Sequence, residues 1–502
     1  MIDVVDVLKV SDFGQRVAEE EADDLHKYFV ETDNWAKLVS GQVDIVYGPK
    51  GAGKSALYSL LVQNRDALFD RGILLIAGEN PRGATAFKNI ASDPPDREEV
   101  FVGLWKLYIL NLINQIFIEY GINNSHSQLV RDFLTAEGLA ERESSLATKL
   151  VATYEYVKSF FTREVESIET GLNFDSILML PTGVTGKITF REPGANQRKN
   201  GFTSVDSLFS EADKALSKAG YSAWVLLDRL DVAFTEHPDL EKNALRALFR
   251  VYLDLSVHRQ IDLKVFLRTD IWRRISEDGF REGSHITRHV TISWSEAAAR
   301  NLIIRRLINN ESIKSKYKID SVDILSSIDK QKELFFRVFP QQIDIGEKKP
   351  STFDWLLSRT FDAGRQFSPR EIIHFMNVLR QEQVKRLETG HAGPEGECLF
   401  ERQTFKEALP EVSKVRLEQT LYAEYPSLKV NIEQLRGQKT SQSLDSLSAI
   451  WSVQADKASS IALSLVEVGF FEKRGDRTNP IYWVPFLYRD SLELSQGSAD
   501  AE

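Results

Sequence analysis

Cysteine is almost missing from this sequence, and its scarcity excludes two kinds of fold. One of the 502 residues is a cysteine, Cys398, so neither an intramolecular disulfide nor a cysteine-rich zinc site can form. We therefore expect a fold held by packing, in a reducing cytoplasmic compartment. With only 28 glycines and 15 prolines, 42% hydrophobic and 27% charged residues, the composition is typical of a folded soluble chain.

Long hydrophobic runs and an excess of basic residues are also missing. The apolar stretches that we identify, such as 223–227, have the length of a strand, whereas a membrane helix needs about 20 residues. The N-terminus turns acidic at 19–24 and lacks the pattern of an export signal, so we predict a protein that is neither exported nor inserted in a membrane. Because the net charge is −10, nucleic-acid binding needs a local basic patch.

A glycine-rich segment between an apolar strand and a helix is the most informative feature. The pattern G-x-x-x-x-G-K-[ST] places backbone N–H groups around a polyphosphate at a helix N-terminus. This indicates ATP binding, with Lys54 on the β and γ phosphates and the Ser55 hydroxyl on Mg²⁺. A glycine-rich turn that merely closes a tight connection is the structural alternative. The predicted cofactor-binding residues are Gly48, Pro49, Lys50, Gly51, Ala52, Gly53, Lys54 and Ser55.

A second carboxylate for this site comes from a buried strand, 224–227. Its continuous apolar run predicts a parallel strand covered on both faces, with Asp228 at the carboxyl end, where ligands bind. Asp228 is the candidate that orients Mg²⁺ through water, and Asp231 is the candidate that polarises the attacking water. The alternative is that both aspartates are turn or helix-capping residues.

Further strands at 73–77, 263–267 and 289–292 bring the expected count to five. Each precedes loop or helix signals, so we predict an α/β fold, a P-loop NTPase parallel sheet with helices on both faces. Arg268 follows the fourth strand in spatial reach of Asp228, where it is a candidate contact for the γ-phosphate. An ion pair between Arg268 and Asp270 is the alternative.

After residue 294 the pattern becomes helical, which indicates a helical lid. Ser368-Pro369-Arg370-Glu371 predicts a helix start, with Ser368 as cap, Pro369 in the first position and Glu371 completing a capping box. Arg370 lies in this first turn, where its charge opposes the helix dipole by about 0.3–1 kcal/mol. The unfavourable placement suggests a function, and a solvated or salt-bridged arginine is the alternative.

The last hundred residues predict a helix to Gly469, then a hairpin across 470–485, which is typical of a winged helix. Such modules bind DNA or protein. Residues 401–490 hold twelve Lys or Arg and twelve Asp or Glu, so the segment lacks the basic excess of a phosphate reader. We favour packing against protein, with DNA contact through Lys473, Arg474 and Arg477 as the alternative.

With these motifs in place, the chain resembles the STAND and KAP-type P-loop ATPases, relatives of the AAA+ group, over roughly 12–383. The resemblance implies that Asp228 and Asp231 are the carboxylate pair after the third core strand. It also implies that Arg268 is the sensor arginine and that Arg370 reaches the nucleotide phosphates from the lid. In the family the acids are usually adjacent, whereas Arg229 follows Asp228 here, which implies slow turnover. A role in prokaryotic stress or antiviral defence is a further implication of the resemblance.

Four segments are predicted along the chain. These are an N-terminal helical segment (1–40), an ATPase core (41–295) with a helical and hairpin insertion at about 80–212, a helical lid (296–395) and a winged-helix-like domain (396–495). Within the insertion, 102–113 has helical spacing and enough apolar residues to be buried all round. Hairpin arms are expected at 177–183 and 186–190, and Thr203-x-x-Asp206 resembles a capping box for the next helix.

The sequence thus predicts a slow Mg-ATP hydrolase that acts as a nucleotide-driven conformational switch, with a protein partner or a homo-oligomer and no membrane. The first alternative is an ATP-gated DNA loader or regulator that uses the winged helix. The second is a nucleotide-binding scaffold that never turns over. Metalloprotease and serine-hydrolase motifs are absent from the sequence.

Overall fold

The computed structural model describes residues 3–17, 20–21, 24–78, 97–140, 145–170, 187–199, 201–230, 238–277, 279–366, 368–476 and 479–499. They form two compact units. We call residues 33–49 and 54–292 the sheet unit, and residues 1–32, 50–53 and 293–502 the helical unit. The buried apolar residues of each unit form a hydrophobic cluster of their own.

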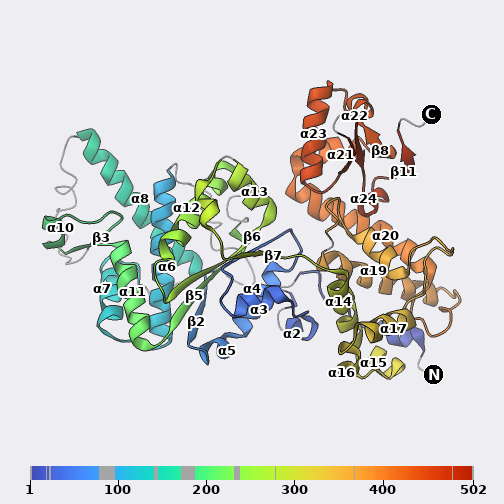
Figure 1. Ribbon diagram of the computed structural model, residues 1–502, viewed down its shortest axis with the longest axis horizontal. Coiled ribbons are helices and arrows are strands. Elements are labelled where there is room, and N and C mark those ends of the chain that lie inside the picture. The colour runs from blue at the N-terminus through green and yellow to red at the C-terminus, as the bar shows by residue number, and fades with distance from the viewer. Residues whose placement is uncertain are drawn as a thin grey trace. The chain divides into compact units, whose positions relative to one another are not determined.

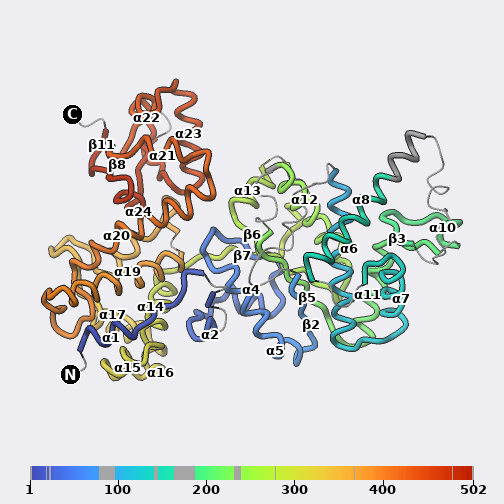
Figure 2. Tube along the Cα trace, turned by 180° about the vertical axis from the view of Figure 1, so that it is seen from behind, coloured from blue at the N-terminus to red at the C-terminus, as the bar shows by residue number. Residues whose placement is uncertain are grey.

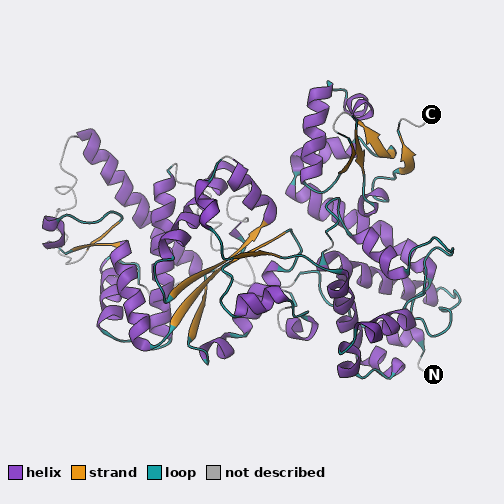
Figure 3. Ribbon diagram, in the orientation of Figure 1, coloured by secondary structure: helices purple, strands orange, loops and turns teal. Residues whose placement is uncertain are grey.

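A five-stranded parallel sheet forms the centre of the sheet unit, which confirms the predicted α/β class. The strand order is β2-β5-β6-β1-β7, so β6 lies between the strand before the glycine-rich loop and the strand before Asp228. Figure 3 shows these strands in orange. Their bounds are β1 Ile45–Gly48, β2 Ile73–Ala77, β5 Ser222–Leu227, β6 Ile261–Arg268 and β7 His289–Thr291.

Alternation along the strands explains why helices cover both faces of this sheet. Val225 and Val265 point into the large apolar cluster of the unit, together with residues of the long crossover helices. Phe266 points to the opposite face, where its ring meets that of Tyr58 at 5.7 Å between centroids. Tyr58 lies in α4 (Lys54–Gln63), the helix that follows the glycine-rich loop. Both faces are therefore apolar, as the continuous hydrophobic strands predict.

The helix α6 (Glu98–Glu119) confirms the prediction of a helix buried all round, and it packs against α12 (Pro238–Leu255). The Trp105 indole donates a hydrogen bond of 2.8 Å to the Ala244 carbonyl of α12. Among the described residues, α6 is the helix long and apolar enough to cross a membrane, with a mean hydropathy of 1.4 over 18 residues. Of this window 78% is buried in the unit, as in the core helix of a globular fold. Apolar segments longer than a strand are therefore present, although the sequence analysis identified only stretches of strand length.

The expected insertion contributes more helices and a small second sheet. In Figures 1 and 2, α7 (Ser125–Ala136) and α11 (Val205–Ala219) lie side by side, and these two helices pack together. The first predicted hairpin arm, 177–183, lies outside the described residues. The second forms β3 (Lys187–Thr189), which pairs in parallel with β4 (Phe202–Ser204). The remaining helices of the unit are α3 Asp33–Val39, α5 Arg65–Phe69, α8 Leu146–Thr170, α10 Ala195–Lys199, α13 Thr269–Glu277 and the 3₁₀ turn Arg281–His285.

The predicted capping box at Thr203 is wrong by one residue. Thr203 belongs to β4, and the cap of α11 is Ser204, whose hydroxyl accepts from the Ser207 N–H at 3.1 Å. The parallel pairing of β3 with β4 keeps Thr203 extended, so the helix can begin only after Ser204. Local sequence patterns do not report this pairing.

The helical unit confirms the predicted change to helices after residue 294. Two of its helices carry residues of the candidate site: α19 (Pro369–Glu388) and α20 (Arg402–Arg416), which pack against each other. A π-helical turn, Leu417–Tyr422, continues α20. The others are α1 Val4–Val10, α2 Leu25–Tyr28, α14 Glu296–Ile308, α15 Glu311–Tyr317, α16 Ser321–Leu325, α17 Ile328–Val338 and α18 Thr352–Thr360.

Residues 429–499 of this unit, which we call the C-terminal module, contain the predicted hairpin, two further strands and four helices in their described part. The sheet order is β11-β8-β10-β9, and β9 pairs antiparallel with β10. Gly469, with φ +76°, follows the end of α23, as the sequence predicts. The bounds are α21 Lys429–Glu433, β8 Lys439–Ser443, α22 Leu444–Trp451, α23 Ala455–Glu467, β9 Glu472–Gly475, β10 Pro480–Trp483, α24 Phe486–Arg489 and β11 Ser495–Ser498.

Candidate functional site

The glycine-rich loop leaves β1 at Gly48 and enters α4 at Lys54, so the predicted strand, loop and helix are confirmed. Gly51 has φ +80° and Gly53 has φ +104°, the left-handed region that side chains with a Cβ avoid. A Cβ placed on Gly53 would meet no described atom within 4 Å, so only its backbone conformation requires glycine. The helix α4 begins directly after this loop. The N–H groups in the first turn of a helix have no partner within the helix, which makes a helix start suited to binding an anion.

Lys54 is the first residue of α4, and its side chain turns back over the loop. The Nζ donates to the carbonyl of Gly48 at 2.9 Å and to that of Pro49 at 3.0 Å. The ammonium group is thus held at the carboxyl end of β1. Ser55, the next residue of the helix, is half-buried beside it.

Asp228 directly follows β5, and its carboxylate is buried, with 3% exposure. It therefore stands at the same edge of the parallel sheet as the loop, two strands away from β1. Arg229 has φ +56°, a conformation that costs energy for a residue with a Cβ and that is enriched at active sites. Asp231, the proposed water-polarising residue, lies outside the described residues.

Arg268 is the last residue of β6, and the parallel register pairs it with Gly48. Its guanidinium contacts Asp270 at two points, Nε to Oδ1 at 3.1 Å and Nη2 to Oδ2 at 2.8 Å. The ion pair that the sequence left open is therefore present. The register also places the arginine beside the first glycine of the loop, where a γ-phosphate contact remains a prediction.

Within the helical unit, the tip of the loop, residues 50–53, is held by three side chains that the sequence did not predict. Lys50 forms an ion pair with Glu424. The hydroxyl of Ser368 donates to the Gly51 carbonyl at 2.9 Å, and the indole of Trp294 donates to the Ala52 carbonyl at 2.9 Å. No local pattern marks these contacts, because each joins residues that are far apart in the sequence and meet only on folding. The separations are 374 residues for Lys50 and Glu424, 317 for Ser368 and Gly51, and 242 for Trp294 and Ala52.

Arg370 lies against this tip. A Cβ added to Gly51 would come within 3.2 Å of the Arg370 Cβ and 2.5 Å of the Ser368 Oγ, so the glycine also allows the close approach of α19. The buried Nε of Arg370 has no hydrogen-bond partner in the described part of the chain. This arrangement leaves the arginine with capacity to bind an acceptor close to the loop.

The predicted capping box at the start of α19 is wrong in its contacts, although Ser368 and Pro369 occupy the predicted positions. The Ser368 side chain caps no N–H of α19, since its hydroxyl donates to Gly51 instead. Glu371 contacts Arg416 of α20, Nη1 to Oε1 at 3.2 Å. Both polar side chains are thus used for tertiary contacts, Ser368 with the loop tip and Glu371 with α20.

The donor set is consistent with Mg²⁺ held in part by a bound phosphate. Ser55 supplies a hydroxyl, Asp228 supplies a carboxylate, and Mg²⁺ typically takes one or two carboxylates with substrate phosphates and water as its other ligands. Within the described ranges no group of three or more His, Cys, Asp or Glu side chains is arranged to hold a metal ion by itself. A metal cage made only of side chains is therefore not found in that part of the chain.

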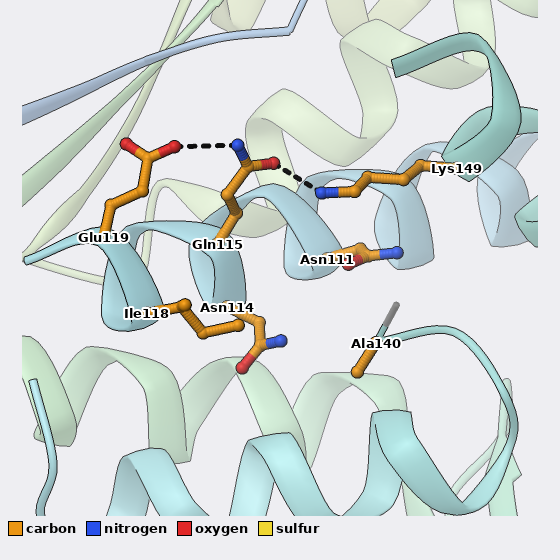
Figure 4. A pocket seen from close by; sticks show the side chains of 7 residues that line it. All are labelled: Asn111, Asn114, Gln115, Ile118, Glu119, Ala140 and Lys149. Carbon is orange, nitrogen blue, oxygen red and sulfur yellow. Dashed lines mark hydrogen bonds between the residues drawn. The ribbon is translucent and has the colours of Figure 1, made fainter. Parts of the chain in front are cut away.

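A separate polar cavity of about 80 Å³ lies beside α6, shown in Figure 4. Lys149 donates to Gln115 at 2.7 Å, and Gln115 donates to Glu119 at 2.8 Å. Burial lowers the pKa of Lys149, which Glu119 partly offsets. Asn111 and Asn114 also line this cavity, and the Oδ1 of Asn114 is buried with no hydrogen-bond partner among the described residues.

Three solved structures show a distant similarity to this chain. A Walker-type ATPase of Pyrococcus abyssi has a TM-score of 0.38 and 12% identity, with 93% of this chain and 96% of that chain covered. The ORC2 protein of Aeropyrum pernix, in ADPNP and ADP complexes, has a TM-score of 0.30 and 10% identity, with 92% of each chain covered. Cdc6p of Pyrobaculum aerophilum has a TM-score of 0.27 and 10% identity, with 94% of this chain and 92% of that chain covered. No protein-family profile and no curated protein matches the sequence. Because every TM-score is below 0.5, these likenesses assign no role to any residue.

Proposed function

We propose that the chain binds ATP with Mg²⁺ at the loop 48–55 and hydrolyses it slowly. The observation that carries this proposal is the loop itself, which joins β1 to α4 through two left-handed glycines, with Lys54 over its carbonyls. Asp228 at the same sheet edge supports it. A polyphosphate needs the N–H groups of such a loop, a cation on its terminal oxygens and a carboxylate for its metal ion.

In this proposal, the charged side chains bind the phosphates, the attacking water and the metal ion. Lys54 binds the β and γ phosphates, and Arg268 and Arg370 bind the γ-phosphate. Asp231 orients and polarises the attacking water. Mg²⁺, when bound through Ser55 and Asp228, offsets the charge of the phosphate oxygens. The strained residue after Asp228 is an arginine rather than a second acid, which supports slow turnover.

We further propose that the nucleotide acts as a switch. The loop's own residues are divided between the two units, since 50–53 group with the helical unit and the residues on either side group with the sheet unit. Arg268 and Arg370 are both assigned to the γ-phosphate in this proposal. Loss of that phosphate on hydrolysis removes the group that both arginines bind in this proposal, as in other phosphate-driven switches.

The C-terminal module supports a protein-facing role rather than DNA binding. Its β8, α22, α23, β9 and β10 follow one another as in a winged helix, and we assign it to that class as part of the proposal. Arg474, one of the three candidate DNA contacts, is bound to Glu472 at 2.9 Å and stacks on the Trp483 ring at 3.9 Å. Its charge is thus offset, and Arg477 lies outside the described residues. Four further points remain predictions from the sequence. These are a protein partner or second copy, a cytoplasmic location, a role in defence and the four-segment division.

Phosphate release from Mg-ATP tests the function. The comparison is wild type, Lys54→Ala, Asp231→Ala and, as a control, the exposed Lys332→Ala, each with and without duplex or single-stranded DNA. We expect slow release that is lost in the first two variants, kept in Lys332→Ala and indifferent to DNA. Strong stimulation by DNA would favour the loader, and tight ATP binding without any release would favour the scaffold and leave Asp231 as a turn residue.

A further inference from the structure

We propose that Glu371 is a positioning residue for Arg370, and that the buried ion pair between Glu371 and Arg416 links Arg370 to the C-terminal module. The inference rests on the proposed function, because Arg370 is assigned there to the γ-phosphate. Glu371 follows Arg370 in the first turn of α19. A change in the position of one residue in this turn therefore changes the position of the other.

The surroundings of Glu371 are unusual for a residue that only stabilises the fold. Its side chain is 1% exposed, Oε1 accepts from Arg416 at 3.2 Å, and Oε2 is buried with no hydrogen-bond partner among the described residues. A buried carboxylate with one charged contact costs about as much in lost hydration as the ion pair returns. An apolar pair would serve packing equally well, so the charge indicates another role.

Arg416 connects this carboxylate to the C-terminal module. Its Nε donates to the hydroxyl of Tyr488 in α24 at 3.4 Å, and Tyr488 is fully buried. Burial alone would lower the pKa of Arg416, but Tyr488 and Glu371 together raise it, so the guanidinium stays charged. One turn earlier in α20, the hydroxyl of Ser413 accepts from the Ser491 N–H at 3.0 Å. The end of α20 is thus fastened to the module at two points.

The chain that continues from Arg416 returns to the loop tip. We call residues 402–424 the α20 arm; it consists of α20, the π-helical turn and Glu424. In the π-helical turn, Gln419 accepts from Arg16 Nη1 at 3.0 Å, and Glu424 pairs with Lys50 of the loop. Single π-helical turns are frequent at functional sites. Here the turn lies between the contact to Glu371 and the contact to Lys50.

The charges around Glu371 explain how it positions Arg370. Burial lowers the pKa of Arg16, Glu371 raises it in opposition, and Arg370 lowers it by a smaller amount. Arg416 and Arg16 therefore both interact with this buried carboxylate, and Arg370, which precedes it in α19, repels Arg16. Without the negative charge of Glu371 these cations repel one another, and Arg370 moves away from its neighbours. A displacement of about 1 Å at a reacting phosphate lowers rates by up to roughly 100-fold.

The test is a double-mutant cycle on hydrolysis, with Glu371→Gln, Arg370→Ala and the double variant. We expect Glu371→Gln to lower kcat about tenfold or more with little change in KM, and to have no further effect when Arg370 is already alanine. The control is Glu401→Gln, because Glu401 pairs with Arg386 near the other end of α19 at 2.9 Å. Independent effects of Glu371→Gln and Arg370→Ala, or an equal loss of kcat in Glu401→Gln, would overturn the inference.

Binding of ATP and ADP separates this inference from the proposed function. If the wild type hydrolyses nothing, the hydrolytic function fails, and the cycle is repeated on the ratio of ATP to ADP affinity. Glu371→Gln should then reduce the preference for ATP only in the presence of Arg370, and equal affinities in the wild type would contradict the inference. If Glu371→Gln does not fold, as judged by circular dichroism, Arg416→Lys takes its place, because it keeps the charge and loses the contact to Tyr488.

Discussion

His374 lies one turn after Arg370 in α19, and its environment favours the neutral imidazole. Burial lowers its pKa to about 4, with Arg16 acting in the same direction and Glu371 opposing. The unfolded chain has the ordinary histidine pKa near 6.5, so it takes up a proton first as the pH falls. Stability contributed by the neutral side chain is therefore complete above pH 6.5 and is lost progressively down to about pH 4.

We expect His374→Gln to remove this pH dependence. The difference in free energy of unfolding between pH 7 and pH 4 should shrink by about 3 kcal/mol relative to wild type, since one pKa unit corresponds to about 1.4 kcal/mol. Chemical denaturation at both pH values measures this difference in free energy of unfolding. The control is His391→Gln, because His391 is exposed. An identical change in wild type and His374→Gln would contradict the assignment of a neutral buried histidine.

The two asparagines of α6 provide a matched test of buried polar groups. Asn111 donates to the Leu139 carbonyl at 2.7 Å, whereas the buried Oδ1 of Asn114 has no such partner in the described structure. Asn111→Leu should lower the free energy of unfolding by about 1–3 kcal/mol, because it leaves the carbonyl unpaired. Asn114→Leu should cost less than about 1 kcal/mol or stabilise. Equal losses in thermal unfolding would show that Asn114 also has a partner, such as an ordered water.

At the scale of elements, the glycine-rich loop can be tested by comparing two left-handed glycines. Gly51→Ala adds a Cβ 2.5 Å from the Ser368 Oγ, whereas Gly121, with φ +65°, has no described atom within 4 Å of such a Cβ. Both substitutions carry the conformational cost of about 1 kcal/mol, but only Gly51→Ala displaces α19 from the loop. We expect Gly51→Ala to bind ATP at least tenfold more weakly than the wild type and Gly121→Ala to bind ATP as tightly as the wild type. Titration calorimetry measures both affinities. Similar affinities in both would contradict the contact.

Elements that depend on local pattern could be predicted from the sequence. The apolar runs of the five strands and the G-x-x-x-x-G-K-[ST] spacing determine the sheet and the loop, because burial on both faces and left-handed glycines each leave a local signature. The strand β4 could not be predicted, because its three residues extend only through pairing with β3. Likewise, the contacts of Ser368 and Glu371 form only because α19 packs beside the loop tip and α20. Capping rules describe a single helix and therefore do not predict such contacts.

At the scale of the whole molecule, the grouping of residues 1–32 with the helical unit was not predictable. Arg306 binds Glu21 and the Phe13 carbonyl, and Arg380 donates to the Ser11 carbonyl at 2.9 Å. These partners are separated by 285, 293 and 369 residues. Periodicity reports which face of a helix is buried but not which distant segment covers it. The same holds for the contacts of the α20 arm with Lys50 and Arg16.

Two separate hydrophobic clusters predict two thermal unfolding transitions, one for each unit. Lys264 of the sheet unit is fully buried and contacts Asp44 at 2.7 Å, whereas Arg306 of the helical unit is 3% exposed and binds Glu21. Removing one member of a buried ion pair costs about 3–5 kcal/mol, because the other charge stays buried. In differential scanning calorimetry we expect Lys264→Met to lower one transition and Arg306→Met to lower the other. A single transition that both variants shift alike would contradict the independence of the two cores.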